Sequence, residues 1–238
     1  MKRKFISFLL VLPLFAAITV SCDDGKIYNE GNSPVKREGS TIKLTAHISK
    51  NSTWPSGYSL VFAGFAPNDE YAQTAKGLGI ENDGSVNMVL SGISNEVNQL
   101  EICIINKLRK RIVTFYKMDF TEQADTIMMD AGVIDASIFN SIQSNIFNAY
   151  CTNCHGAGNS AAGDLYLTED KSYAALINVK AVSSEEGKML VKPNDVENSY
   201  MLDVLTEGAS PHYHNDILSA QMDKLSLLKS WIEEGAQK

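Results

Sequence analysis

The fold of the first half of the chain is indicated most clearly by the stretch Ile42-Lys43-Leu44-Thr45-Ala46-His47-Ile48. Apolar and polar residues alternate along it, and successive side chains of a β-strand point to opposite faces of a sheet. The stretch therefore predicts a half-buried strand whose isoleucines and leucine enter a core. His47 falls on the polar side of this pattern, so we interpret it as a surface histidine.

Short runs of the same kind continue to about residue 135. They occupy residues 58–66, 86–90, 100–104, 112–118 and 126–134, with turn-forming or charged residues between them. No long helical pattern separates the runs, which argues against a parallel α/β sheet. We predict an antiparallel β-sandwich over residues 40–135, immunoglobulin-like or transthyretin-like. Within it, Cys103 lies in an apolar run and is expected to pack in the core.

The apolar spacing changes near residue 136. Ile138, Ile142 and Ile146 recur every four residues, which predicts an amphipathic helix that starts at a cap on Asp135 or Ser137 and runs into Cys151. A short helix is expected to end at Leu205. The last helix is expected to start at Ser219 and to end at Gly235. The chain is thus predicted to have two domains, the second an all-α domain over residues 136–238.

The N-terminal segment has the features of an export signal. Residues 2–4 are basic, residues 5–20 are mostly apolar, and small residues lead to Cys22. The ending Thr19-Val20-Ser21-Cys22 resembles a bacterial lipobox, although its first position usually prefers Leu. We predict a signal peptide over residues 1–21, lipidation of Cys22 and a flexible tether over residues 22–39. Cleavage near Cys22 without lipidation is the alternative.

This segment predicts an exported lipoprotein, held to a membrane by its lipid and facing the periplasm or the cell surface. The chain has a formal net charge of −7 and no dominant basic patch, so nucleic acid is not an expected partner.

The chemistry of the chain is expected at Cys151-Thr152-Asn153-Cys154-His155. This is the C-x-x-C-H pattern of haem attachment. Two thiols at this spacing can form thioethers with the two vinyl groups of one porphyrin, and the adjacent imidazole can bind the iron. Cys151 and Cys154 are therefore predicted to hold one haem c, with His155 as the proximal ligand.

Two other interpretations of the motif stay open. A C-x-x-C pair can be a dithiol redox motif, although no βαβ pattern surrounds this one. A zinc site would need a second pair of ligands, which His212 and His214 could supply.

The sequence around the motif resembles the single-haem cytochrome c domains that are appended to bacterial exported proteins. The resemblance rests on a helix entering C-x-x-C-H-G, a Leu-x-Leu, a Val-x-Pro stretch ending in Asn-Ser-Tyr, and a closing Trp-Ile-x-x-Gly-Ala. These are here residues 146–156, 165–167, 191–200 and 231–236, and they cover less than half of the chain after residue 21. The resemblance implies an all-α cytochrome c-like domain.

The second iron ligand is where the chain departs from that family. Relatives usually present a Met in the loop before the last helix, whereas the loop here is Ala209-Ser210-Pro211-His212-Tyr213-His214-Asn215. We predict that His212 is the distal ligand because it best matches the family Met by its distance from the last helix. His214 is the second candidate, and Met201 is a weaker one.

These features predict a membrane-anchored c-type cytochrome that exchanges electrons with a redox partner protein or with a membrane electron-transfer component. The alternative is a cell-surface binding module for a glycan or a protein, with the haem domain as an accessory. An enzyme is less expected, because no catalytic triad, carboxylate pair or phosphate-binding loop is present and a haem with two protein ligands has no open position.

Overall fold

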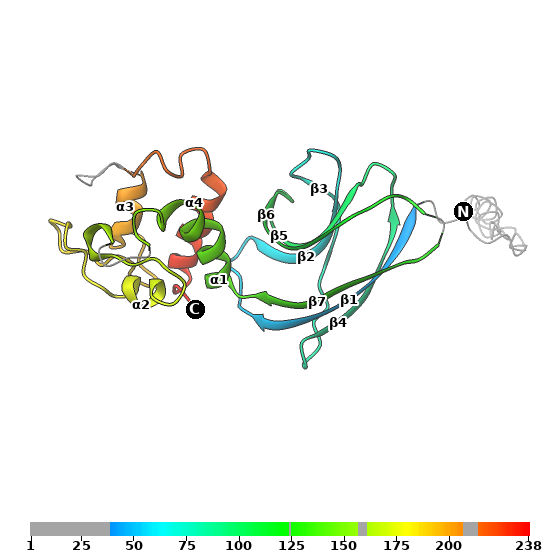
Figure 1. The fold of residues 1–238 in the computed structure, drawn as a ribbon, viewed down its shortest axis with the longest axis horizontal. Coiled ribbons are helices and arrows are strands. Elements are labelled where there is room, and N and C mark those ends of the chain that lie inside the picture. The colour runs from blue at the N-terminus through cyan, green and yellow to red at the C-terminus, as the bar shows by residue number, and fades with distance from the viewer. Residues whose placement is uncertain (1–38, 124, 157–160, 207–213) are drawn as a thin grey trace, which may run out of the picture. The chain divides into compact units, whose positions relative to one another are not determined.

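The computed structural model describes residues 39–123, 125–156, 161–206 and 214–238 (Figure 1). The predicted signal peptide, Cys22, most of the tether and His212 lie outside these residues. The described part contains seven strands: β1 (Ser40–Asn51), β2 (Tyr58–Phe65), β3 (Ala72–Gly77), β4 (Ser85–Ile93), β5 (Gln99–Asn106), β6 (Arg111–Asp119) and β7 (Ile127–Ala136). Its helical segments are α1 (Ile138–Ile142), the π-helix η1 (Gln143–Cys151), the 3₁₀ turn η2 (Ala162–Asp164), α2 (Ser172–Leu176), α3 (Tyr200–Thr206) and α4 (Met222–Glu233).

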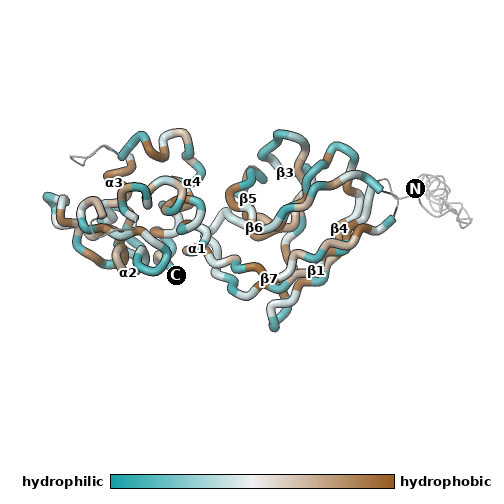
Figure 2. The backbone as a smooth tube through the Cα atoms, in the orientation of Figure 1, coloured by the Kyte–Doolittle hydropathy of each residue, from teal (hydrophilic) through white to brown (hydrophobic). Residues whose placement is uncertain are grey.

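The strands form two sheets that share one apolar core. Their orders are β4-β1-β7 and β3-β2-β5-β6. Ile42 and Leu44 of β1 are fully buried in this core beside Phe62 and Ile102 of the second sheet, as the alternation around Leu44 predicts. In Figure 2, hydrophobic residues recur along strands such as β5 and β7 and in the helical segments.

The prediction of a purely antiparallel sandwich is wrong for the first sheet. Strand β1 pairs antiparallel with β4 but parallel with β7, so that Leu44 lies opposite Met88 on one side and Met129 on the other. Local alternation is the same for both strand directions. A parallel pair needs a long connection, and here that connection is the whole chain from β2 to β6.

Strand β5 is buried on both faces, because each face meets a separate apolar cluster. Leu100 and Ile102 face the shared core, whereas Cys103 and Ile105 lie in a second, smaller cluster with Phe65. The start of β3 contacts the β5–β6 hairpin near that cluster, since the amide of Ala72 donates to the carbonyl oxygen of Arg109 at 3.0 Å. Cys103 is thus buried, as its apolar run predicts.

The expected all-α cytochrome c-like domain is not observed. Only four short α-helices occur in the described part, and α2 and α3 have five and seven residues. Between them the chain is irregular, with isolated bridges that join Ile177 to Val191 and Met189 to Ser199. Asn178, Gly187 and Asn194 adopt positive φ angles there, a conformation that interrupts helices. The structure is therefore mostly β-sheet with short helices.

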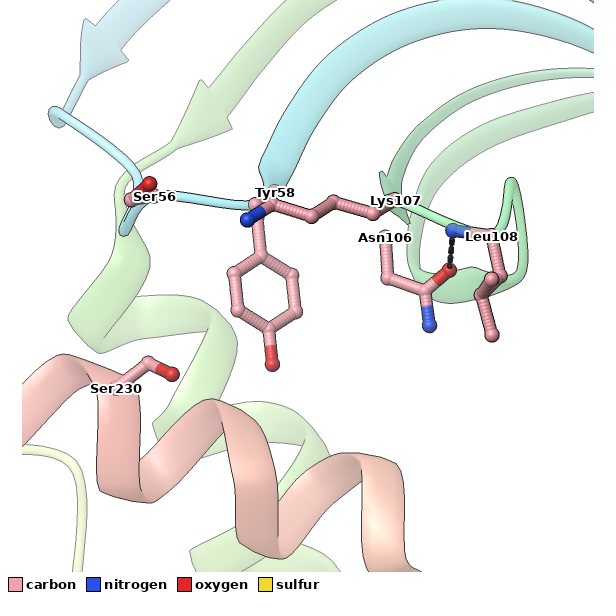
Figure 3. Close-up of a pocket in the computed structure, with 7 residues that line it drawn as sticks. Ser56, Tyr58, Asn106, Lys107, Leu108 and Ser230 are labelled. Atoms are coloured by element: carbon pink, nitrogen blue, oxygen red, sulfur yellow. Dashed lines mark hydrogen bonds between the residues drawn. The ribbon is translucent and has the colours of Figure 1, made fainter.

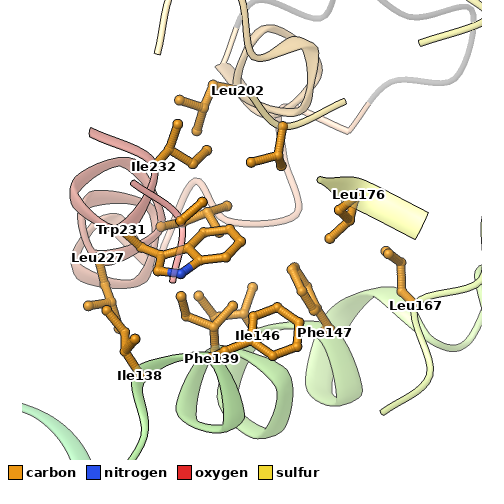
Figure 4. Close-up of a cluster of buried hydrophobic side chains, with 14 of the residues drawn as sticks. Ile138, Phe139, Ile146, Phe147, Leu167, Leu176, Leu202, Leu227, Trp231 and Ile232 are labelled. Atoms are coloured by element: carbon orange, nitrogen blue, oxygen red, sulfur yellow. The ribbon is translucent and has the colours of Figure 1, made fainter. Parts of the chain in front are cut away.

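A third cluster packs the helical segments together (Figure 4). Phe139 of α1 lies 5.6 Å from Trp231 of α4 between ring centroids, and Phe147 of η1 is buried beside them. Ile104 and Val113 of the second sheet belong to the same cluster. Residues Arg37–Lys238 form one compact unit, and apolar packing runs from its sheet into its helices.

The last helix ends as its sequence predicts but starts later. Its first residue is Met222 rather than a residue next to Ser219, and Gly235 follows its end with a φ of 99°. None of the helices in the described ranges has the length and apolar composition needed to cross a bilayer.

Candidate functional site

The candidate site begins at the C-terminal end of a helix that is fixed at its start. The segments α1 and η1 follow each other without a break and end at Cys151. At the start, the amide of Ser137 donates to Oδ1 of Asp135 at 2.9 Å, and the amide of Ile138 donates to Oγ of Ser52 at 3.2 Å. Of the two predicted capping residues, Asp135 is therefore the one whose side chain accepts a backbone hydrogen bond. These contacts position the helix that leads to the motif.

The last two turns of this helix have π-helical hydrogen bonds. The amide of Thr152 donates to the carbonyl of Phe147, five residues earlier, at 3.0 Å. In this register Cys151 lies on the same side of the helix as Ile146 and Phe147, which are both buried. Cys151 accordingly packs against the apolar cluster. Single π-helical turns occur often at functional sites.

The two cysteines of the motif have different surroundings. Cys154 is exposed, whereas Cys151 is half-buried, and this burial raises the pKa of its thiol to about 11. Dithiol redox motifs depend on a cysteine whose pKa is lowered toward neutrality. The environment of Cys151 is the opposite of that, so the redox interpretation of the motif loses support.

The backbone holds His155 from both sides. Its amide donates to the carbonyl of Cys151 at 2.9 Å, and its carbonyl accepts from the amide of Leu167 at 2.7 Å. The following Gly156 has no room for a side chain, because a Cβ atom there would lie 1.9 Å from the carbonyl oxygen of Thr152. This explains in physical terms why glycine follows the motif.

The imidazole of His155 is half-buried. Its Nδ1 atom is buried and has no hydrogen-bond partner within the described residues. Burial lowers the pKa of His155, the nearby carbonyls of Leu165 and Ala162 oppose this, and His214 adds a smaller lowering. The lowered pKa favours the neutral ring, which is the form that binds metals.

A second imidazole lies beside the first. The ring centroids of His155 and His214 are 6.0 Å apart, and the two ring planes are inclined by 32°. A metal atom bonded at about 2 Å to one nitrogen of each ring would place the ring centres roughly 6 Å apart. The structure thus brings together two of the predicted iron ligands, although 58 residues separate them in the sequence.

The other predicted ligands lie elsewhere. His212 falls in the segment 207–213, outside the described residues. Met201 is half-buried in α3 and packs against the cluster around Trp231. In the ranges that the structure describes, no group of three His, Cys, Asp or Glu side chains could hold one metal ion, so the described donors do not form a zinc site of three or four ligands.

Sequence analysis did not single out Gln143. Its side chain is buried with 1% of its surface exposed, and it contacts the segment that holds His155. The sequence feature that could have identified Gln143 is its position next to Ile142, where a polar residue falls on the apolar side of the predicted helix.

Two surface pockets of the described part lie away from the motif. One, of about 220 Å³, is lined by residues of the β1–β2 loop, the β5–β6 hairpin and α4, and Figure 3 shows Tyr58 pointing from β2 toward Ser230 in it. The other, of about 510 Å³, lies along β5 and β6 and includes Glu101 and Arg111. Glu101 is buried and accepts hydrogen bonds from Arg111 and from the hydroxyl of Thr114.

Comparisons with known proteins do not assign a family. No protein-family model matches the chain, and no curated protein matches it. Among solved structures, phospholipase PlaB from Legionella pneumophila is similar over 40% of this chain and 25% of its own, with 14% identity and a TM-score of 0.17. A similarity at that TM-score carries no argument about fold or function, so the case for this chain rests on its own residues.

Proposed function

We propose that the chain is an exported, membrane-anchored c-type haem protein that transfers electrons. Cys151 and Cys154 would form the two thioethers, and His155 and His214 would bind the iron. The observation that carries the proposal is the pairing of the His155 imidazole with that of His214 at 6.0 Å, directly after the C-x-x-C motif. A haem held in this way supplies a one-electron iron couple.

The residues of the chain suit this role. The π-helical end of η1 and the hydrogen bonds of His155 to Cys151 and Leu167 fix the backbone of the motif. Burial lowers the pKa of His155, which favours the neutral imidazole that can donate a lone pair. Cys154 is exposed, so its thiol is accessible to the machinery that attaches haem.

Ligation by two histidines favours electron transfer over catalysis. An iron bound by both His155 and His214 would leave no open position for a substrate or a gas. An imidazole in place of the usual Met also lowers the reduction potential, because Met ligation raises it. The partner is then a redox protein or a membrane electron-transfer component, which the N-terminal lipid would keep close to the membrane surface.

The proposal is tested by the spectrum of the full chain, purified from a host that attaches haem c. We expect a low-spin iron that does not bind carbon monoxide. Replacement of His214 by Ala should produce a high-spin, carbon-monoxide-binding iron, whereas the matched replacement of His212 by Ala should leave the spectrum unchanged. A wild-type iron that is high-spin and binds carbon monoxide would contradict the electron-transfer role.

A further inference from the structure

The buried Gln143 connects three segments around the candidate site. Its Nε2 donates to Oδ1 of Asn148 at 2.8 Å and to the carbonyl of Leu167 at 2.8 Å. Its Oε1 accepts from the hydroxyl of Ser172, which is also fully buried. All three polar groups of the amide are therefore used, as a buried amide requires.

Leu167 links this network to the iron-ligand candidate. The carbonyl of Leu167 accepts from Gln143, while the amide of the same residue donates to the carbonyl of His155 at 2.7 Å. A continuous path of hydrogen bonds thus runs from the Gln143 side chain, through one peptide segment, to the backbone of His155. The same segment carries Leu165, whose carbonyl lies near the His155 ring.

The network also acts within the helix. Gln143 is the first residue of η1, and Asn148 lies five residues later, which is the spacing of a π-helical turn. The hydrogen bond between the two side chains therefore favours the π register that turns Cys151 toward the buried side. The side-chain amide of Gln143 therefore connects the orientation of Cys151 with that of His155.

We propose that Gln143 is a positioning residue that sets the orientation of the His155 imidazole toward the iron. This inference rests on the proposed haem function and adds an outer-shell residue to it. Outer-shell partners fix the orientation of metal-binding histidines, and their loss typically costs about 10–100-fold in metal affinity or activity. Here the hydrogen bonds reach the histidine through its backbone.

The test compares two variants of the full chain in a host that attaches haem c. Gln143→Met keeps the length of the side chain but removes both N–H donors and the oxygen that accepts from Ser172. Asn145→Leu is the matched control, since Asn145 lies on the same helix and its amide contacts only the carbonyl of Ser141 within the described part. In Gln143→Met we expect the fraction of iron that binds carbon monoxide to rise above that of the wild type, with both thioethers intact. Asn145→Leu should resemble the wild type.

The outcomes separate this inference from the proposed function. A wild-type chain without haem would contradict the function. If the wild type carries haem and Gln143→Met has the same spectrum and the same carbon-monoxide binding, the role of Gln143 is contradicted. The proposed function is then unaffected.

A second test uses the haem-free wild-type chain, so it does not depend on whether a variant folds. The amide hydrogen of Leu167 should exchange as slowly as that of Leu228 in the middle of α4, because it donates to the carbonyl of His155 while the buried Gln143 holds the carbonyl of the same residue. Fast exchange of the Leu167 amide, while the α4 amides stay protected, would also contradict the proposal.

Discussion

At the scale of single residues, the motif depends on a glycine as much as on its cysteines and histidine. The backbone after His155 passes close to the carbonyl of Thr152, at a distance that only glycine tolerates. Gly156 does not adopt a positive φ angle, so glycine is needed at this position because a side chain has no room, and not because of the backbone conformation. A larger residue would have to displace the turn that carries both cysteines.

We therefore predict that Gly156→Ala lowers the free energy of unfolding by about 2 kcal/mol, the usual cost of forcing an added group into a packed site. The measurement is urea unfolding of the haem-free chain. Gly79→Ala is the control, because a Cβ atom at Gly79 meets nothing within 4 Å. The control should stay within about 0.5 kcal/mol of the wild type. An equal effect of the two substitutions would contradict the steric explanation.

The sequence predicts some site residues and not others. Cys151, Cys154 and His155 are adjacent, so a local pattern identifies them as candidates. The pairing of His155 with His214 depends on how intervening loops fold, and spacing alone favoured His212. Gln143 acts through contacts with Leu167 and Ser172, which no local pattern contains.

At the scale of elements, the helix before the motif was predictable but its register was not. The spacing of Ile138, Ile142 and Ile146 correctly predicts a helix that reaches Cys151. The spacing of these three isoleucines does not distinguish α-helical from π-helical hydrogen bonding. The π register follows from hydrogen bonds such as that between Gln143 and Asn148, which are formed only in the folded chain.

The start of the same helix depends on Asp135. Burial acts to raise the pKa of this carboxyl group, but hydrogen bonds from Ser137 and the ion pair with Lys50 outweigh it and hold the pKa below its ordinary value. A lowered pKa in the folded state means that the ionised group stabilises the fold above its unfolded pKa. That contribution is lost as the pH falls through the folded pKa.

We predict that Asp135→Ala costs about 1 kcal/mol at pH 7, because its carboxylate accepts hydrogen bonds from Ser137 and Asn140 at the start of the helix. The difference from the wild type should shrink as the pH falls below about 4, where Asp becomes protonated. Thermal unfolding of the wild type and the variant at several pH values between about 3 and 7, on either side of the ordinary Asp pKa, measures this difference. The exposed Asp125→Ala is the control. A difference that does not change with pH would show that the carboxylate charge is not involved.

The prediction of an all-α second half was wrong for a reason at this scale. The predicted helices account for only part of this half, and Met189 and Val191 lie in bridges between extended segments. Short apolar runs do not distinguish strands from helices, and the positive φ angles at Asn178 and Asn194 break the chain into short pieces.

At the scale of the whole molecule, the sheet and the helices stabilise each other. Ile104 and Val113 lie in the same buried cluster as Phe139 and Trp231. Polar contacts add to this, since Lys110 pairs with Asp223 of α4 and the amide of Ser56 donates to Glu234. We expect residues 39–238 to unfold as one cooperative unit.

Trp54 lies in the loop before β2 and Trp231 lies in α4, and both side chains contact the cluster that joins the second sheet to the helices. The indole of Trp54 donates to the carbonyl of Ala136, and that of Trp231 donates to the carbonyl of Gln237. In the haem-free chain, NMR signals of both indole groups should disappear at the same urea concentration. Ile104→Ala should lower both midpoints equally and cost about 3 kcal/mol, because it opens a cavity in the shared cluster. Two separate midpoints, with only that of Trp54 affected, would contradict the shared core.

The most direct test of the account is the mass of the tryptic peptide over residues 118–171 from chain exported by a host that attaches haem c. The peptide carries Cys151, Cys154 and His155 and has no internal Lys or Arg. The account predicts that its mass increases by one haem and that the double replacement of Cys151 and Cys154 by Ser removes this increase. An unmodified peptide with two free thiols, from colourless protein made in that host, would contradict it.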